Sequence, residues 1–220
     1  MRNSFLVLGL LFANSIFAQK IVLSEASKVN ENNDKRLYRI ESTSNSIKLG
    51  TIEIVGDLDN DVAAFNAFYQ KARTVGANSY IYSVEKDLNN EDIRSNVKII
   101  SLYFTQNLPE KYNTYYILNS GKSQNVVVSG KKVEIPSKSF IQDDIKTDES
   151  NYISTRKFLG SRINLYYKSS QPEQYFQVIS GGVKSDQTGV GGLVLKTGDL
   201  IMLERSFANF LTLFYKRVTL

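Results

Sequence analysis

Carboxylates are the side chains in this sequence with the clearest capacity for chemistry, and the first group of them is Asp57, Asp59 and Asp61. Alternate carboxylates of this kind open a calcium-binding loop, because the loop folds them around one hard cation. The rest of that pattern is missing, since Val62 stands where the loop needs Gly and Phe68 where it needs Glu. The favoured interpretation is that the three residues begin a helix. Their carboxylates would accept hydrogen bonds from its free N–H groups and offset the positive end of its dipole. A metal site at these residues is the alternative.

A second acidic group follows later in the chain, at Asp143, Asp144, Asp148 and Glu149. A glycosidase needs two carboxylates that flank the bond it cleaves, so this group supplies candidate catalytic residues for a hydrolase acting on glycans. Spacing along the chain does not set the separation of these side chains in space. A solvated loop is the favoured interpretation, and the catalytic role is the alternative.

Two basic sites are candidates for ligand binding. Residues 180–192 contain five glycines around Lys184, but the lysine follows Val183, whereas a phosphate-binding loop requires Gly directly before its Lys. The segment is therefore interpreted as a long hairpin whose loop could contact a ligand. Lys131 and Lys132 lie close to another predicted turn. These three lysines are the predicted ligand contacts.

Charge is divided unevenly between the two halves of the chain. Residues 19–110 carry 11 basic and 13 acidic side chains, whereas residues 111–220 carry 15 and 9. The basic second half could attract an anionic glycan, lipid or protein of a cell envelope. Because no run of Lys or Arg is longer than two residues, we do not expect a nucleic-acid partner.

Composition removes several classes of mechanism. The chain has no Cys, His or Trp. Serine–histidine and cysteine–histidine mechanisms are therefore excluded, and a zinc or copper centre is not expected because imidazole and thiolate ligands are missing. We predict no cofactor and no disulfide, so the fold depends on packing alone.

The beginning of the chain has the pattern of a secretory signal peptide. Arg2 precedes an apolar run at residues 5–17, and Ala18 provides a small residue at the expected cleavage point. The run is too short to cross a bilayer as a helix, and no later apolar stretch is longer. We expect residues 1–18 to be removed after Ala18 and the mature protein to be exported, without a transmembrane segment, to the periplasm or beyond.

The elements that would position these residues fall into two groups. After a polar, flexible lead-in at residues 19–35, an α+β domain is predicted over residues 36–108, with one helix on a small sheet. Its helix has Val62, Phe65, Tyr69 and Ala72 on one face and ends at Gly76. The predicted strands of this domain are residues 37–40, 47–55, 79–84 and 97–104.

Residues 111–220 are predicted to form a mostly antiparallel all-β unit, a sandwich or an open barrel. Short β-like runs separated by turn residues recur through this region, with turns at Gly130 and at residues 197–199. The last run, residues 211–215, is predicted as a strand. A short final helix is the alternative there, because Phe207, Phe210, Leu211 and Phe214 also fit one helix face.

One stretch resembles a known group of domains. Residues 50–56, then the predicted helix, then Lys71-Ala72 and Gly76-Ala77-Asn78 leading into a strand resemble small βαββ domains of the bacterial envelope. These domains include those named for heavy-metal binding and the Rcs-type outer-membrane stress sensors. The resemblance covers residues 47–105 and implies a fold only. The sensors' cysteines are absent, so neither their disulfides nor their lipid anchor carries over.

Together these observations favour a non-enzymatic exported protein that serves as a binding or structural module of the bacterial envelope. The alternative is a carboxylate-dependent hydrolase acting on glycans. The whole chain resembles exported envelope proteins of double-membraned bacteria whose proteins are rich in Asn, Lys and Ile.

Overall fold

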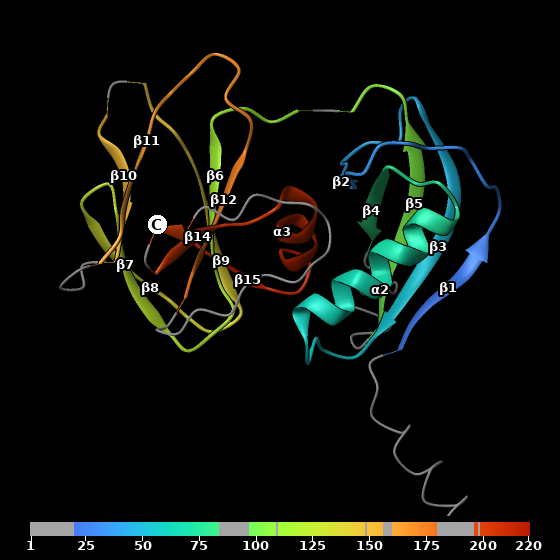
Figure 1. Cartoon of the computed structure of the whole chain (residues 1–220), viewed down its shortest axis with the longest axis horizontal. Coiled ribbons are helices and arrows are strands. Elements are labelled where there is room, and N and C mark those ends of the chain that lie inside the picture. The colour runs from blue at the N-terminus through green and yellow to red at the C-terminus, as the bar shows by residue number, and fades with distance from the viewer. Residues whose placement is uncertain are drawn as a thin grey trace, which may run out of the picture.

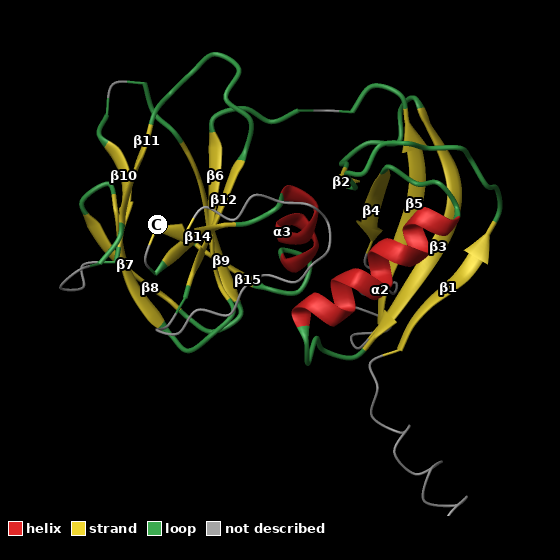
Figure 2. Ribbon diagram, viewed as in Figure 1, coloured by secondary structure: helices red, strands yellow, loops and turns green. Residues whose placement is uncertain are grey.

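The computed structural model describes residues 20–83, 97–108, 110–147, 149–155, 160–179, 196–197 and 199–220. Within these ranges the chain is mostly β, as predicted, with three sheets and two helices (Figures 1 and 2). No helix in the described part has the length and apolar composition needed to cross a membrane. The predicted signal peptide lies outside the described residues.

The first sheet is built from residues 20–105 and has five strands in the order β1-β3-β5-β4-β2. Among the strand pairs described in this sheet, β2–β4 is parallel and the others are antiparallel. The strands are β1 (Lys20–Ala26), β2 (Tyr38–Arg39), β3 (Ser46–Val55), β4 (Ser79–Ser83) and β5 (Val97–Thr105). Strand β1 lies within residues 19–35, where a flexible lead-in was predicted. Its backbone is held by antiparallel pairing with β3, a partner that local sequence does not reveal.

A bulge in β3 changes which residues face the core. Strict alternation would place Leu49 on the opposite face from Ile52 and Ile54. The register of β3 against β5 shifts between Lys48 and Gly50, and all three apolar residues are buried as a result. Gly50 is required at this position, because a Cβ there would lie 2.4 Å from the carbonyl oxygen of Glu25 on β1. The strand predicted at residues 47–55 therefore forms, but simple alternation does not describe the direction of Leu49.

Helix α2 (Asp61–Thr74) buries Ala64, Phe65, Phe68 and Ala72 against this part of the molecule. Its N-cap is Asn60, whose side-chain oxygen accepts a hydrogen bond from the Ala63 amide at 3.1 Å. The helix ends before Gly76, which has the positive φ of 74° expected after a helix C-terminus. The same glycine allows close approach of the chain, because a Cβ there would lie 1.7 Å from the Asn30 carbonyl oxygen.

The second part of the chain forms two sheets, an arrangement compatible with a β-sandwich. One has six strands in the order β13-β14-β12-β6-β9-β15, and the other has four in the order β11-β10-β7-β8. A shared apolar cluster, which includes Tyr115, Ile117, Ile141 and Phe176, involves both sheets. The strands are β6 (Thr114–Asn119), β7 (Gln124–Val128), β8 (Lys131–Ile135), β9 (Ser139–Asp144), β10 (Asn151–Ser154), β11 (Arg162–Leu165), β12 (Gln174–Val178), β13 (Lys196–Thr197), β14 (Leu200–Met202) and β15 (Lys216–Val218).

A helix forms near the end of the chain, where the favoured prediction was a strand. Helix α3 (Arg205–Leu211) is capped by Glu204, whose carboxylate accepts from the Phe207 amide at 2.9 Å. The predicted strand at residues 211–215 is wrong, and the helical alternative holds for Phe207, Phe210 and Leu211 but not for Phe214, which lies in a turn after the helix. The reason is that Phe207 and Phe210 share one helix face and both contact Phe65 of α2, at ring-centroid distances of 5.2 and 5.6 Å.

Helix α3 lies between the first sheet with α2 and the six-stranded sheet (Figure 1). One apolar cluster runs continuously from Ile52 and Phe68 through Phe210 to Tyr116 and Leu118 of the six-stranded sheet. The side-chain rings of Phe68 and Phe210 stack with their centroids 5.0 Å apart. The two parts of the chain therefore share a core, although their strands pair only within each part among the residues described.

Candidate functional site

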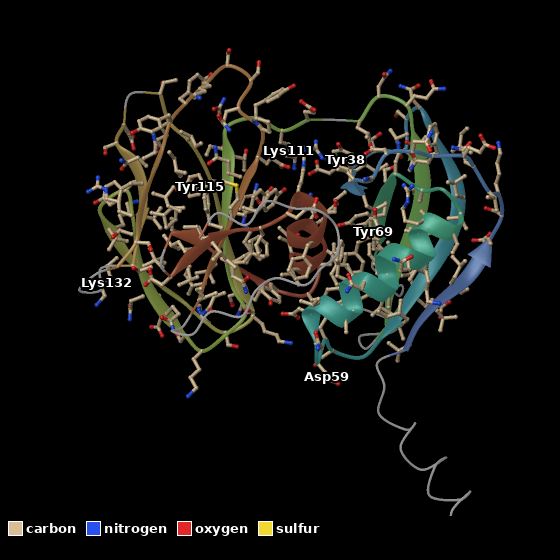
Figure 3. All side chains as sticks on the ribbon, in the orientation of Figure 1. Tyr38, Asp59, Tyr69, Lys111, Tyr115 and Lys132 are labelled. Atoms are coloured by element: carbon tan, nitrogen blue, oxygen red, sulfur yellow. The ribbon has the colours of Figure 1, made fainter. Side chains whose placement is uncertain are left out.

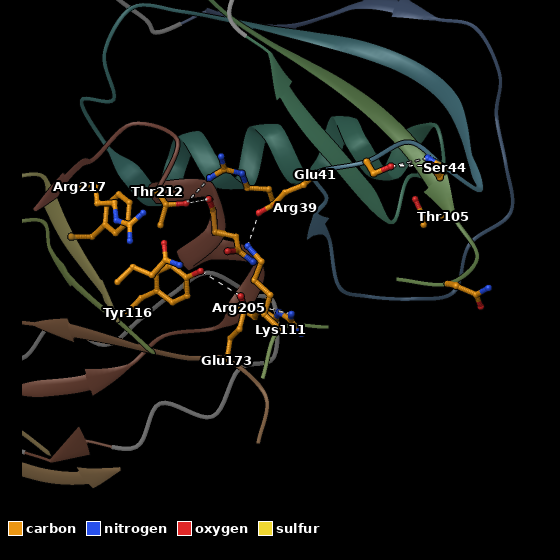
Figure 4. Close-up of a pocket in the computed structure, with 15 residues that line it drawn as sticks. Arg39, Glu41, Ser44, Thr105, Lys111, Tyr116, Glu173, Arg205, Thr212 and Arg217 are labelled. Carbon is orange, nitrogen blue, oxygen red and sulfur yellow. Dashed lines mark hydrogen bonds and ion pairs between the residues drawn. The ribbon is translucent and has the colours of Figure 1, made fainter. Parts of the chain in front are cut away.

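A pocket of about 570 Å³ opens where the two parts of the chain meet. It has the volume of a small-molecule site, because such sites range from roughly 300 to 1,000 Å³. Both parts contribute its wall (Figure 4). The lining residues are Arg39, Glu41, Ser42, Ser44, Thr105, Asn107, Lys111, Tyr116, Phe140, Gln142, Glu173, Arg205, Asn209, Thr212 and Arg217.

Strand β2 and the loop after it supply the wall on the first side. The Tyr38 amide bonds to the Asn78 carbonyl at 2.8 Å and the Ile40 amide to the Tyr80 carbonyl at 3.0 Å. Tyr38 and Ile40 are buried while Arg39 between them is exposed, as strand alternation requires. This backbone pairing directs Arg39 away from the first sheet and into the pocket.

The second wall combines one face of the six-stranded sheet with one face of α3. Tyr116 on β6 pairs with Gln142 on β9, and Arg217 on β15 pairs with Phe140 on the same strand β9. These four residues line the pocket from adjacent strands. Arg205, Asn209 and Thr212 are spaced by four and three residues, so they lie on one face of α3, from its first residue to its C-cap.

The pocket contains two ion pairs of different burial. Lys111 Nζ lies 2.5 Å from Glu41 Oε1, and both side chains are largely exposed. Hydrogen bonding by Lys111 lowers the pKa of Glu41 below its ordinary value. Arg205 Nη2 lies 2.9 Å from Glu173 Oε2, and these side chains are only 16% and 5% exposed. The second pair is therefore part of the packed interior of the molecule.

Glu173 also accepts hydrogen bonds from two tyrosines. The Tyr175 hydroxyl lies 2.8 Å from Glu173 Oε2 and the Tyr116 hydroxyl 3.4 Å from Glu173 Oε1. The two tyrosine rings stack with centroids 4.6 Å apart. Burial, reinforced by the Glu173 carboxylate, raises the pKa of both tyrosines, so each hydroxyl stays protonated at neutral pH.

Two arginines of the pocket are left without an acidic partner. Neither Arg39 nor Arg217 forms an ion pair with any carboxylate in the described part of the chain. Arg39 donates one hydrogen bond, from Nη1 to Thr212 Oγ1 at 3.3 Å. With four cationic and two anionic side chains in its lining, the pocket carries a net charge of +2. An open, positively charged cavity with polar walls suits an anionic ligand.

The predicted metal-site alternative falls on residues outside the pocket. Asp57 and Asp59 are exposed, and Figure 3 shows Asp59 directed away from the body of the molecule. Asp61 accepts a hydrogen bond from the Tyr215 hydroxyl at 2.5 Å and lies 3.8 Å from Lys138 Nζ. Among the residues that the structure describes, no three acidic side chains gather closely enough to hold a metal ion.

The predicted catalytic carboxylates are likewise not brought together by contacts within the described ranges. Asp143 accepts from the Tyr115 hydroxyl at 3.2 Å, and Asp144 accepts from Thr114 Oγ1 at 2.8 Å. As successive residues of β9 they point to opposite faces of the sheet. Glu149 pairs with Lys146 at 3.2 Å, and Asp148 lies outside the described residues.

The predicted ligand-binding lysines lie away from the pocket. Lys131 and Lys132 are exposed on β8, an outer strand of the four-stranded sheet, and Figure 3 shows Lys132 at the far side of the molecule from α2. Lys184 lies outside the described residues. Nothing in the sequence singled out Arg39 or Arg217, because Arg39 is an isolated basic residue and Arg217 belongs to a short Lys-Arg pair of a kind that recurs in the chain. The only local signal was at Arg39, a charged residue between two apolar ones.

Comparison of the chain with models of protein families, with curated proteins and with solved structures found no match. The resemblance of residues 47–105 to small βαββ envelope domains therefore stays a prediction.

Proposed function

We propose that the chain is a non-enzymatic binding module, exported to the cell envelope, whose ligand binds in the pocket between its two parts. The observation that carries the proposal is the pair of arginines, Arg39 and Arg217, that line a cavity of about 570 Å³ without acidic partners. Together they give the lining of this cavity an excess of positive charge, and a positively charged cavity favours an anionic ligand. Export to the envelope is supported by the pattern of residues 1–18 alone.

Two further features support binding without catalysis. The pocket's two carboxylates, Glu41 and Glu173, are each held by a cation, whereas a general acid or base must be free to exchange a proton. Walls contributed by different parts of a chain are also common in ligand sites, because a cleft forms where two packed bodies meet.

The proposal includes the two-unit organisation, an α+β domain at residues 36–108 followed by a β-rich domain at residues 111–220. It is supported by strand pairing, which does not cross between the first sheet and the later sheets in the described residues. The shared aromatic contacts between α2 and α3 lead us to expect that fragments cut at residues 108–113 would stay associated. Limited proteolysis followed by gel filtration tests this expectation.

A pocket-filling variant tests the binding function. Gln142 lines the pocket from the middle of β9, so Gln142→Trp should fill much of the cavity while leaving the strand intact. Ser169→Trp, in an exposed turn outside the lining, is the matched control. Ligand-observed NMR of residues 19–220 would use glucose, glucosamine, glucuronate and glucose 6-phosphate as probes. We expect at least one probe to bind the unchanged chain and the Ser169 variant but not the Gln142 variant. Binding that is indifferent to Gln142→Trp would overturn the assignment of the pocket.

A further inference from the structure

We infer that the ligand of this pocket is a polyhydroxylated oxyanion, either a sugar acid or a sugar phosphate, whose anionic group binds between Arg39 and Arg217. The inference rests on the proposed binding function and specifies its ligand class. Its starting point is the division of the four pocket cations into two kinds. Lys111 and Arg205 are each occupied by a carboxylate of the protein, whereas the other two arginines are not.

The two unpaired arginines act on the same place. Arg39, Arg217 and Tyr116 all line the pocket, and both guanidinium charges lower the pKa of the Tyr116 hydroxyl, against the larger raising effects of burial and Glu173. Figure 4 shows the Arg39 side chain reaching across the pocket toward Thr212, on the side where Arg217 and Tyr116 lie. Arg39 comes from β2 of the first part and Arg217 from β15 of the second. An anion between them would therefore be held by both parts of the chain.

The chemistry of arginine identifies the group that would bind. A guanidinium is planar and presents its N–H donors as a fork that matches the oxygens of a carboxylate or phosphate. Two such forks directed at one place offer more donors than a neutral hydroxyl can accept. A cationic ligand would instead meet the net positive charge of the lining.

The remainder of the lining indicates a hydroxyl-rich body for the ligand. Seven neutral hydrogen-bonding side chains accompany the charged groups, and the two remaining lining residues are aromatic, Tyr116 and Phe140. Hydroxyl and amide side chains can both donate and accept, as a sugar's hydroxyl groups require, while aromatic rings contact its C–H surfaces. The neutral polar lining residues are Ser42, Ser44, Thr105, Asn107, Gln142, Asn209 and Thr212.

The test compares anionic, neutral and cationic probes of one shape. Dissociation constants of glucuronate, glucose 6-phosphate, glucose, glucosamine and inorganic phosphate would be measured by calorimetry at low ionic strength. We expect glucuronate or glucose 6-phosphate to bind at least about tenfold more tightly than glucose, since a charge-assisted hydrogen bond is worth roughly this factor. The tighter of these two anions distinguishes a sugar acid from a sugar phosphate.

Variants locate the anionic group. Arg39→Gln and Arg217→Gln should each weaken binding of the sugar anion about tenfold and weaken glucose binding much less. Lys216→Gln is the matched control, because Lys216 precedes Arg217 on β15, is exposed and does not line the pocket. Thermal unfolding of each variant would confirm that it is folded.

The possible failures separate the inference from the proposed function. Suppose that glucose binds as tightly as the anions, and that its affinity falls in Gln142→Trp but not in either arginine variant. The pocket then binds ligands, but the oxyanion inference is wrong. If inorganic phosphate binds as tightly as glucose 6-phosphate, the hydroxyl-rich part of the inference is wrong. If no sugar probe binds, both the inference and the proposed function are contradicted.

Discussion

Two charged contacts between the two parts of the chain differ in whether their charges are matched. At the beginning of α2, Asp61 is joined to the second part by the Tyr215 hydroxyl at 2.5 Å and lies 3.8 Å from Lys138. Lys138 also donates to the Leu58 carbonyl. In the pocket, by contrast, Arg39 and Arg217 remain after the carboxylates are paired. A matched contact stabilises the interface by itself, whereas an unmatched one leaves capacity for another molecule.

Alkaline pH should have the largest effect, because both contacts include buried tyrosines. Burial raises the pKa of Tyr116 in the pocket, of Tyr175 stacked on it, and of Tyr215 at the other contact. Tyrosines of the unfolded chain lose their protons near the ordinary pKa of about 10, while the folded ones keep theirs. The stability that this difference provides is fully present below about pH 10 and is lost as pH rises further.

Urea unfolding, followed by circular dichroism at a series of alkaline pH values, measures this loss. Tyrosinate absorbance should rise together with unfolding. If all tyrosines ionise while the fold stays intact, the buried tyrosines do not hold the contacts as described.

The next largest effect is expected at the buried pair of the pocket. Glu173→Ala leaves Arg205 with its charge largely buried, which should lower the free energy of unfolding by about 3 kcal/mol. Glu41→Ala is the matched control in the same pocket, and because its pair with Lys111 is exposed we expect a change below about 1 kcal/mol. Equal losses in the two variants, measured by urea unfolding, would contradict the distinction between a structural and an exposed pair.

Removing the matched contact at α2 should have a smaller effect. Asp61→Ala deletes the acceptor of the Tyr215 hydroxyl and the neighbour of Lys138, and we expect a loss of about 2 kcal/mol. Asp59→Ala, two residues earlier and exposed, should change stability by less than about 0.5 kcal/mol. If neither substitution lowers the melting temperature, the matched contact at Asp61 does not stabilise the fold as described.

Local patterns were sufficient to predict some elements but not the pocket. Gly76 and the apolar spacing of α2 predicted that helix, because caps and helix faces are properties of neighbouring residues. The bulge at Gly50 depends on the backbone of another strand, so periodicity alone would place Leu49 on the wrong face. Arg39 and Arg217 come from opposite ends of the sequence and meet only when the two parts pack together. The contrast between matched and unmatched charges therefore becomes visible only in the fold.

The unmatched arginines should contribute almost nothing to stability. Arg217→Gln removes one of two like charges near Tyr116, so the free energy of unfolding should stay within about 0.5 kcal/mol of that of the unchanged chain. Lys216→Gln serves as the neighbouring control on β15. A loss above about 1 kcal/mol specific to Arg217 would show that this residue has a structural role and would remove the contrast with Asp61.

The smallest effect concerns cations on an open surface, represented by Lys131 and Lys132 on β8. Exposed lysines attract anionic lipid or polysaccharide weakly, and salt at physiological strength screens charges beyond roughly 8 Å. Co-sedimentation of residues 19–220 with vesicles containing phosphatidylglycerol should therefore fall steeply as salt increases. Changing both lysines to Glu should weaken it further, whereas Arg39→Gln should not, because that arginine lies in the pocket. If the chain does not bind these vesicles at low salt, or binds equally after both lysine changes, the surface lysines serve solubility and the pocket arginines remain the only proposed anion site.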